Sequence, residues 1–240
     1  MPTQVATRRI MLKLSGELFA GQGGYGIDAD LVKQFAAEVQ EAKRATGAQI
    51  VIVAGGGNIM RGASVKGTSI QVVTGHYMGM LAGVLNGMAL VDILNDSGVP
   101  SILQSRLAIG TMLEPFVRGI AIRHLEEGKV VLMAGGSGLP YVTHDTASVT
   151  AALELGCEVV LKGSDVDGIY DKDPKTHADA KKHLAVTHEQ ALLDPNIKVF
   201  DAAAISLALE NELPIVVFDM LCPGNIRRAI DGEAIGTRVG

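Results

Sequence analysis

Short apolar runs alternate along the chain with segments in which apolar residues recur every three or four positions. The runs are nearly continuous in Val, Ile and Leu, which predicts strands covered on both faces, while the recurring pattern predicts helices. We expect strands at residues 9–14, 49–54, 101–104, 129–134, 158–162 and 214–219. We expect helices from Asp30 to about Gly47 and at residues 76–96, 114–127, 146–155, 188–193 and 202–211. This alternation is typical of an α/β fold with a mostly parallel sheet.

Local signals support three of these helices. The apolar stripe of the first consists of Leu31, Phe35, Val39 and Ala42. The segment 187–190 (Thr-His-Glu-Gln) resembles a capping box, in which the threonine and glutamine side chains bond the first backbone N–H groups. Thr146 is a candidate cap for the helix at 146–155.

The helix at 76–96 carries an unusual ridge of small residues. Gly75, Gly79, Gly83 and Gly87 recur every four residues and therefore share one face. Each helical glycine costs about 1 kcal/mol relative to alanine, so a close approach of another backbone has to compensate. That backbone belongs either to the same subunit or to a second one, and our hypothesis is that this segment contributes to a subunit interface.

The composition indicates a folded domain of ordinary size. The chain has 240 residues, of which 48% are hydrophobic and 20% are charged, so it is long enough to bury a large core and too apolar to be disordered. The sequence contains no internal repeat and no long linker. We therefore expect one domain over residues 1–240, with two lobes built on one continuous sheet.

Charge, cysteine content and apolar stretches narrow the class of protein further. The 21 Lys and Arg residues against 26 Asp and Glu residues argue against a basic nucleic-acid binder. The two cysteines, Cys157 and Cys222, are too far apart in sequence to suggest a disulfide framework, which favours the cytosol. Residues 1–9 are polar, and the uncharged stretch at 77–91 is short and contains several glycines. We expect neither a signal peptide nor a membrane span.

Candidate functional residues gather at the ends of the predicted strands. The first strand ends in Lys13-Leu14-Ser15-Gly16, the second runs into Gly55-Gly56-Gly57-Asn58 with Arg61, another is followed by the segment 135–146, and the next ends in Lys162-Gly163-Ser164-Asp165. Ligands of open α/β sheets gather at the carboxyl ends of the strands. Glycine-rich turns and helix N-termini offer N–H groups to phosphate oxygens, and lysine and arginine add positive charge. The set predicts a polyanion site on one rim.

Each of these features has a simpler explanation when it is taken alone. A glycine run after a strand is often only a tight turn. Lys13 is harder to dismiss, because a lysine is rarely buried without a partner, although an edge strand or a side chain that reaches solvent would also explain it. A helix N-cap would explain Asp145. Their combination on one rim is what favours phosphate binding.

Several familiar sites are absent from the sequence. It contains no G-x-x-x-x-G-K-[ST] phosphate loop and no G-x-S-x-G nucleophile motif. Residues 21–26 match G-x-G-x-x-G but do not directly join a strand to a helix, so a glycine loop is the better interpretation. His177, His183 and His188 lack the spacing of zinc ligands, and we expect them on the solvated surface and no metal site in the protein.

Four segments carry a resemblance to a known family. They read Lys-Leu-Ser-Gly at 13–16, Gly-Gly-Gly-Asn…Arg-Gly at 55–62, Tyr-Met-Gly-Met-Leu at 77–81 and Asp-Val-Asp-Gly-Ile-Tyr…Asp-Pro at 165–174. In this order they closely resemble the bacterial UMP kinases of the amino acid kinase family, and the likeness runs from about Arg9 to Thr237. The resemblance implies an α/β/α sandwich, a cytoplasmic homohexamer and transfer of the γ-phosphoryl group of ATP to UMP with Mg²⁺ held mainly through the ATP phosphates. An acceptor lobe covers roughly residues 1–150 and an ATP lobe roughly 151–240.

The resemblance also assigns roles to individual positions. The catalytic residues that it implies are Lys13, Asp145, Lys162 and Arg61, with Asp145 organising the lysines. The implied ATP-binding residues are Lys13, Leu14, Ser15, Gly16, Gly57, Arg61, Ser164, Tyr170 and Asp173. The implied UMP-binding residues are Gly56, His76, Gly136, Ser137, Gly138, Leu139, Pro140, Tyr141, Val142 and Thr143. The loop associated with allosteric GTP in some members matches Gly21, Gln22, Gly23, Gly24, Tyr25 and Gly26, and UTP is a second possible effector.

Three positions depart from the family pattern. His76 stands where an acidic residue commonly contacts the UMP ribose, Leu139 where Asn is common, and Ser164 where Thr is common. Histidine lacks the two acceptor oxygens of a carboxylate, so these changes bear on acceptor affinity and not on phosphoryl transfer. Two other functions stay open: an amino acid kinase with a carboxylate or carbamate acceptor, and a non-catalytic oligomer that binds anions or nucleotides.

Overall fold

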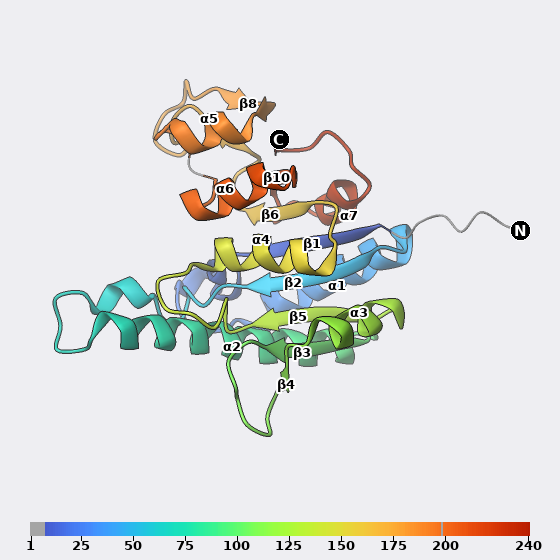
Figure 1. Cartoon of the computed structure of the whole chain (residues 1–240). Coiled ribbons are helices and arrows are strands. Elements are labelled where there is room, and N and C mark those ends of the chain that lie inside the picture. The colour runs from blue at the N-terminus through green and yellow to red at the C-terminus, as the bar shows by residue number, and fades with distance from the viewer. Residues whose placement is uncertain (1–7, 198) are drawn as a thin grey trace, which may run out of the picture.

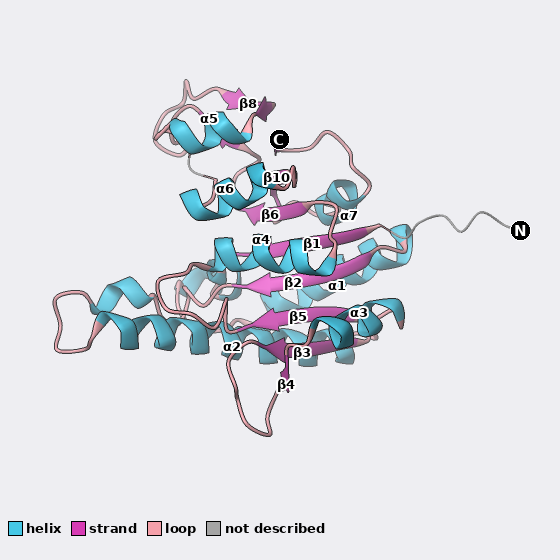
Figure 2. Ribbon diagram, in the orientation of Figure 1, coloured by secondary structure: helices cyan, strands magenta, loops and turns pink. Residues whose placement is uncertain are grey.

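One continuous sheet organises the molecule (Figures 1 and 2). The computed structural model describes residues 8–197 and 199–240. The sheet contains β1 (Arg9–Leu14), β2 (Gln49–Ala54), β3 (Ser101–Ser105), β4 (Glu114–Pro115), β5 (Val130–Ala134), β6 (Val160–Ser164), β9 (Ala185–Val186), β10 (Ile215–Asp219) and β11 (Thr237–Val239). Its strand order is β4-β3-β5-β2-β1-β6-β10-β11-β9, and of its strand pairs only β10–β11 is antiparallel. The mostly parallel sheet of the prediction is confirmed.

Helices cover both faces of this sheet and bury two apolar clusters. One face is covered by α1 (Ala29–Thr46), α2 (Val72–Asp96) and α7 (Asn225–Ile230). The other is covered by α3 (Arg118–Glu126), α4 (His144–Leu155), α5 (His188–Leu193) and α6 (Ala202–Glu210). Both faces of the central strands are therefore removed from water, which is why their sequences are nearly continuous in apolar residues. The three-layer α/β/α architecture is confirmed.

Alternation along the strands decides which side chains reach which face. In β1, Leu12 and Leu14 belong to the cluster under α1, whereas Met11 belongs to the cluster under α4. Lys13 follows the parity of Met11 and points toward α4. In β6, Lys162 likewise follows Val160, a member of the α4-side cluster.

Several boundaries differ from the sequence prediction. The helix expected at 114–127 begins only at Arg118, because Glu114–Pro115 pair with β3 as strand β4. The helix expected at 146–155 begins at His144, and its N-cap is Thr143 rather than Thr146. In α1 the fully buried stripe is Val32, Ala36, Val39 and Ala42, while Leu31 and Phe35 are half-buried. The capping box at Thr187 and Gln190 is confirmed.

Short elements near the C-terminus escaped the sequence prediction. They are β9, β11, α7 and the hairpin of β7 (Ile169–Tyr170) with β8 (Lys182–His183). The four strands have two or three residues each, too few for a period to be recognised, and α7 has six. Among them β11 extends the sheet beyond β10, and α7 packs against α1.

The glycine ridge of α2 packs inside its own chain, so its glycines are not compensated by a second subunit, while the contribution of this segment to a subunit interface stays a prediction. A Cβ atom on Gly75 would lie 2.6 Å from the carbonyl oxygen of Gly62, and one on Gly83 would lie 3.2 Å from that of Ala54. The same backbone approach continues along the helix at Gly79, while Gly87 faces Leu103. The ridge lets α2 lie close to the loop after β2 and to the sheet.

The apolar helix α2 is longer than the uncharged stretch considered in the sequence. It spans 25 residues, and it is the one helix in the described part of the chain that is long and apolar enough to cross a membrane. Its inner face, however, is buried in the core through Met80, Val84, Leu90 and Leu94. Because this face of α2 packs in the core of a globular fold, its apolar sequence is explained by its role as a core helix.

Candidate active site

Three adjoining cavities lie along the carboxyl ends of the central strands. The glycine cavity, of about 430 Å³, is lined by the Gly55, Gly56 and Gly57 turn with Arg61 and His76. The lysine cavity, of about 560 Å³, is lined by Lys13 and Lys162 among others. The tyrosine cavity, of about 500 Å³, is lined by Tyr170, Asp173 and Pro174 among others.

Shared walls join these cavities into one trough. Lys13 and Ser15 line both the glycine and the lysine cavity, and Lys162 and Ser164 line both the lysine and the tyrosine cavity. Within this trough the lysine cavity lies between the other two, because it shares lining residues with each of them. The expected convergence of strand-end residues on one rim is therefore present.

The two lysines are neighbours across the sheet. Lys13 on β1 and Lys162 on β6 are register partners, although 148 residues separate them in sequence. Lys13 is only 8% exposed, and β1 lies in the middle of the sheet, so neither an edge strand nor a solvent-reaching side chain explains it. Its Nζ instead lies 2.7 Å from Oδ1 of Asp145 at the start of α4. A buried cation with a partner is the arrangement expected at a functional site.

Asp145 is available for this contact because another residue caps the helix. The hydroxyl oxygen of Thr143 accepts the N–H groups of Asp145 and Thr146. The N-cap interpretation of Asp145 is wrong, and its carboxylate points to Lys13.

Lys162 has a weaker partner for its positive charge than Lys13 has. Its Nζ donates a hydrogen bond to the carbonyl oxygen of Val199. Burial, followed by the charge of Lys13, lowers the pKa of Lys162 to about 8, while Asp145 acts in the opposite direction. The ammonium form of Lys162 is therefore destabilised by its surroundings. A negatively charged ligand would stabilise it, which favours anion binding at this position.

A segment that sequence reasoning missed lies over the lysines. The ring centroid of Phe200 is 5.0 Å from Nζ of Lys162 and 5.8 Å from Nζ of Lys13. The next residue, Asp201, caps α6 and accepts hydrogen bonds from the hydroxyl groups of Thr143 and Thr146. Burial opposes ionisation of Asp201, but hydrogen bonds from Thr143, Ala204, Thr146 and Ala203 outweigh it and hold the pKa of Asp201 below its usual value. In the sequence, Asp201 can be recognised only as a candidate helix cap, and nothing there indicates that Phe200 lies near the two lysines.

The glycine cavity owes its shape to close backbone contacts. A Cβ on Gly56 would lie 2.5 Å from the backbone nitrogen of Gly83, and one on Gly16 would lie 2.5 Å from that of Gly57. The buried Asn86 fixes the same turn through bonds of 2.7 Å to Oδ1 of Asn58 and 2.7 Å to the carbonyl oxygen of Gly55. These glycines are thus required by packing, and the packing presents their backbone to the cavity.

The mouth of the glycine cavity carries polar and aromatic groups. Arg61 and Glu17 form an exposed ion pair there. His76 and Tyr141 place their ring centroids 4.7 Å apart, with the planes tilted by 51°. Leu139 and Tyr141 are 61% and 69% exposed, which leaves this side of the cavity open to a ligand.

His144 is a further residue of this cavity that the sequence did not single out. Its Nε2 atom is buried and has no hydrogen-bond partner among the residues that the structure describes. Burial, reinforced by the charge of Lys13, lowers the pKa of His144, so its ring is neutral at physiological pH. The residue lies beside Gly83 and Gly136 and lines the cavity floor.

Tyr170 and Asp173 are held by contacts within the loop that follows β6. The Tyr170 hydroxyl donates to Oδ1 of Asp167 at 2.5 Å, which raises the pKa of Tyr170. Asp173 accepts the N–H of Lys175 at 2.9 Å. Both residues face the tyrosine cavity together with Ser164.

Some residues assigned by resemblance lie outside the trough walls among the described residues. Gly136, Ser137, Gly138 and Pro140 form the turn behind Leu139, where Gly138 packs on Arg106. Of the loop at 21–26, Gly21 lines the lysine cavity, Gly26 bonds to Asn58, and Tyr25 is exposed. No side-chain position is described for Gln22.

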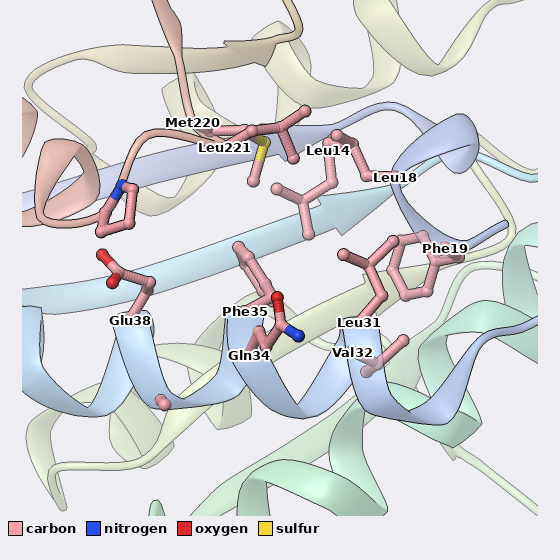
Figure 3. Close-up of a pocket in the computed structure, with 12 residues that line it drawn as sticks. Leu14, Leu18, Phe19, Leu31, Val32, Gln34, Phe35, Glu38, Met220 and Leu221 are labelled. Atoms are coloured by element: carbon pink, nitrogen blue, oxygen red, sulfur yellow. The ribbon is translucent and has the colours of Figure 1, made fainter. Parts of the chain in front are cut away.

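The Leu14 side chain points to the opposite face of the sheet. There it lines an apolar cavity of about 320 Å³ with Phe35, Met220 and Leu221, as Figure 3 shows. Any contact of Leu14 with a ligand in the trough is left to its backbone.

No protein metal cage is present within residues 8–197 and 199–240, because no three His, Cys, Asp or Glu side chains converge there. One expectation about the histidines is wrong. His188 is buried rather than solvated, and its Nε2 lies 2.9 Å from the carbonyl oxygen of Leu213.

Known proteins with similar sequences and folds match almost the whole chain. A model of the amino acid kinase family matches residues 8–219. The chain is 44% identical over 237 residues to the uridylate kinase of Xanthomonas euvesicatoria pv. vesicatoria, covering 99% of this chain and 98% of that protein. The UMP kinase structure from Bacillus anthracis has a TM-score of 0.92 at 32% identity, covering 97% of this chain and 96% of the other. That from Ureaplasma parvum has a TM-score of 0.90 at 30% identity, covering 98% and 99%.

Proposed function

This chain belongs to the amino acid kinase family, and from that premise we propose that it transfers the γ-phosphoryl group of ATP to UMP, giving ADP and UDP. The observation that carries the proposal is the trough itself. Two lysines on adjacent strands lie between a glycine-lined cavity and a tyrosine-lined cavity. This arrangement suits two nucleotides whose phosphates meet end to end.

The nucleotides divide the trough between them. UMP occupies the glycine cavity, with its phosphate toward the 55–57 turn and its nucleoside toward His76 and Tyr141. The ATP nucleoside occupies the tyrosine cavity beside Ser164, Tyr170 and Asp173. The phosphates of ATP lie in the lysine cavity against the backbone of residues 13–16. Residues 1–150 then form roughly the acceptor lobe and residues 151–240 the ATP lobe.

Neutralisation of charge is the main task of the site. The second pKa of a phosphate monoester is about 6, so the acceptor phosphate of UMP is already largely ionised and needs no general base. Lys13 and Lys162 contact the γ-phosphoryl oxygens as these gain charge, and Asp145 keeps Lys13 in position. Arg61 exchanges Glu17 for phosphate, since a guanidinium binds phosphate through two parallel hydrogen bonds.

Magnesium enters with ATP rather than through a protein cage. The two carboxylates that line the lysine cavity are engaged in the free protein, because Glu17 pairs with Arg61 and Asp165 pairs with Lys175, and the nearby Asp145 pairs with Lys13. This donor set fits a Mg²⁺ ion held by phosphate oxygens and water, which is a common mode for this ion. When bound, the ion supplies charge neutralisation to the triphosphate.

The protein acts as a homohexamer in the cytoplasm, with GTP and UTP as effectors. The outer face of α2 offers a contact surface, since Tyr77, Met78, Leu81 and Leu85 are 42%, 36%, 47% and 50% exposed. These four residues are apolar and neighbour one another on the helix. The 21–26 loop, which reaches the lysine cavity at Gly21, is the part through which GTP acts.

An ADP-release assay tests the proposed reaction. The protein with ATP and Mg²⁺ should release ADP only when UMP is added, and UDP should be the second product. CMP, glutamate and aspartate serve as competing acceptors in parallel reactions. Release with glutamate or aspartate in place of UMP would make the protein another kind of amino acid kinase. No acceptor-dependent release would leave a nucleotide-binding protein without transfer activity.

A further inference from the structure

Phe200 lies between groups that the proposed reaction needs and yet offers no reactive atom. Its ring centroid is within 6 Å of both lysine Nζ atoms, at 5.0 Å for Lys162 and 5.8 Å for Lys13. The side chain packs on the apolar cluster between the sheet and α4 and remains half-buried. It follows Val199, whose carbonyl accepts from Lys162, and precedes Asp201, which ties α6 to the start of α4.

The two ammonium groups near the Phe200 ring have fewer negatively charged partners than positive charges. Lys13 has a carboxylate partner in Asp145, whereas Lys162 has only the carbonyl oxygen of Val199. His144, the other titratable group on this part of α4, is neutral because its pKa is lowered. The Asp201 carboxylate already accepts hydrogen bonds from Thr143, Thr146 and the first N–H groups of α6, and so it is not a partner of the lysines. Two ammonium groups thus share one counter-ion.

An aromatic face supplies part of the missing negative potential. The face of a phenyl ring attracts cations within about 6 Å, by about 0.5–2 kcal/mol depending on solvation. An aliphatic side chain of similar size would fill the same space without this attraction. An ordinary core role would thus be met by Leu or Met, while contact with two ammonium groups needs a ring.

We propose that Phe200 is a positioning residue of the phosphoryl-transfer site, whose ring contacts the Lys13 and Lys162 ammonium groups and holds them close together. The inference rests on the proposed function for its catalytic meaning, but the contact itself exists in the free protein. Without the ring, the two cations separate and must be brought together again by the phosphates. The expected loss is in turnover, because residues of the glycine cavity bind the UMP nucleoside.

Matched substitutions separate the ring from its volume. Phe200→Leu and Phe200→Met remove the aromatic face and keep an apolar side chain, and Phe200→Tyr keeps the face. We expect kcat to fall about tenfold in the Leu and Met variants, with the KM for UMP changed less than twofold, and kcat to stay within about twofold in the Tyr variant. Phe35→Leu, on the opposite side of the sheet, is the control and should leave kcat unchanged.

A second readout needs no enzymatic activity. Acetylation of lysine amines, followed over pH by mass spectrometry, reports the pH at which Lys162 loses its proton. Loss of the ring removes a stabilising contact of the cation, so the midpoint should move to lower pH in Phe200→Leu and Phe200→Met but not in Phe200→Tyr or Phe35→Leu. Melting curves establish that each variant is folded. If the Phe200→Leu variant does not fold, the Phe200→Met variant provides the same comparison with Phe200→Tyr.

The outcomes are distinguishable. Equal midpoints in the Leu, Met and Tyr variants would overturn the role of Phe200, whatever the activity of the protein. Equal losses of kcat in all three would also overturn it, because packing alone then explains the residue. A wild-type protein that releases no ADP with UMP, but shows the expected shift in midpoint, would refute the proposed reaction and retain the contact.

Discussion

Replacing Lys162 by methionine should abolish activity and yet stabilise the free protein at neutral pH. Burial, with a contribution from the charge of Lys13, lowers the pKa of Lys162 to about 8 from the ordinary value of 10.5. A difference of about 2.5 units corresponds to about 3 kcal/mol at 1.36 kcal/mol per unit. Methionine removes this penalty but leaves the Val199 carbonyl without its donor, at a cost of about 1 kcal/mol. The net gain is about 2 kcal/mol at pH 7.

The dependence on pH is the decisive part of this prediction. Because the folded pKa lies below the unfolded one, the unfolded chain binds more protons between pH 8 and 10.5. The penalty of the wild-type lysine is therefore fully present below about pH 8 and disappears as the pH rises toward 10.5. The advantage of Lys162→Met should shrink from about 2 kcal/mol at pH 7 to nearly nothing at pH 10.

Urea unfolding at the two pH values measures the effect. The midpoint of Lys162→Met should be higher than that of the wild type at pH 7, with an unchanged slope, and the two midpoints should nearly coincide at pH 10. Lys33→Met, at an exposed position of α1, is the control and should change stability by less than about 0.5 kcal/mol at either pH. A Lys162→Met variant that is less stable than the wild type at pH 7, or equally favoured at both pH values, would refute the reasoning.

Four further substitutions, the last of them a control, test other parts of the molecule. Lys13→Ala should lower kcat at least 10²-fold, about 2.7 kcal/mol, with the fold retained by circular dichroism, and near-normal turnover would remove Lys13 from the reaction centre. His76→Asp should lower the KM for UMP with kcat little changed, and a higher KM would mean that His76 is itself a ligand. Gly75→Ala should destabilise the protein by about 1–3 kcal/mol in urea unfolding, because the new Cβ meets the Gly62 carbonyl at 2.6 Å. Gly119→Ala, in an open helical position of α3, should instead stabilise by about 0.5–1 kcal/mol, and equal effects of the two alanines would contradict the packing account.

The amino-acid sequence by itself determined the fold class and most of the central elements. Strands β1 and β2 have the predicted bounds, because a buried parallel strand must be apolar on both faces and this leaves a continuous run. The sequence also placed Lys13 and Lys162 in the last residues of predicted strands and Arg61 in the loop after another, near the strand ends where ligands of such sheets bind. Boundaries that depend on pairing were less predictable, as Glu114 shows by joining β4 instead of a helix.

Only the tertiary structure decided which of these residues meet. Lys13 and Lys162 became neighbours through the pairing of β1 with β6, and no local pattern encodes that pairing. Phe200 reads in the sequence as one apolar residue before a helix, and its place over two lysines follows from the packing of α6 on α4. The glycine ridge of α2 could have faced either a partner or its own chain, since its spacing fixes a shared face but not a neighbour. Local sequence sets the period and the capping of each element, whereas contacts between distant elements arise only when their faces are buried together.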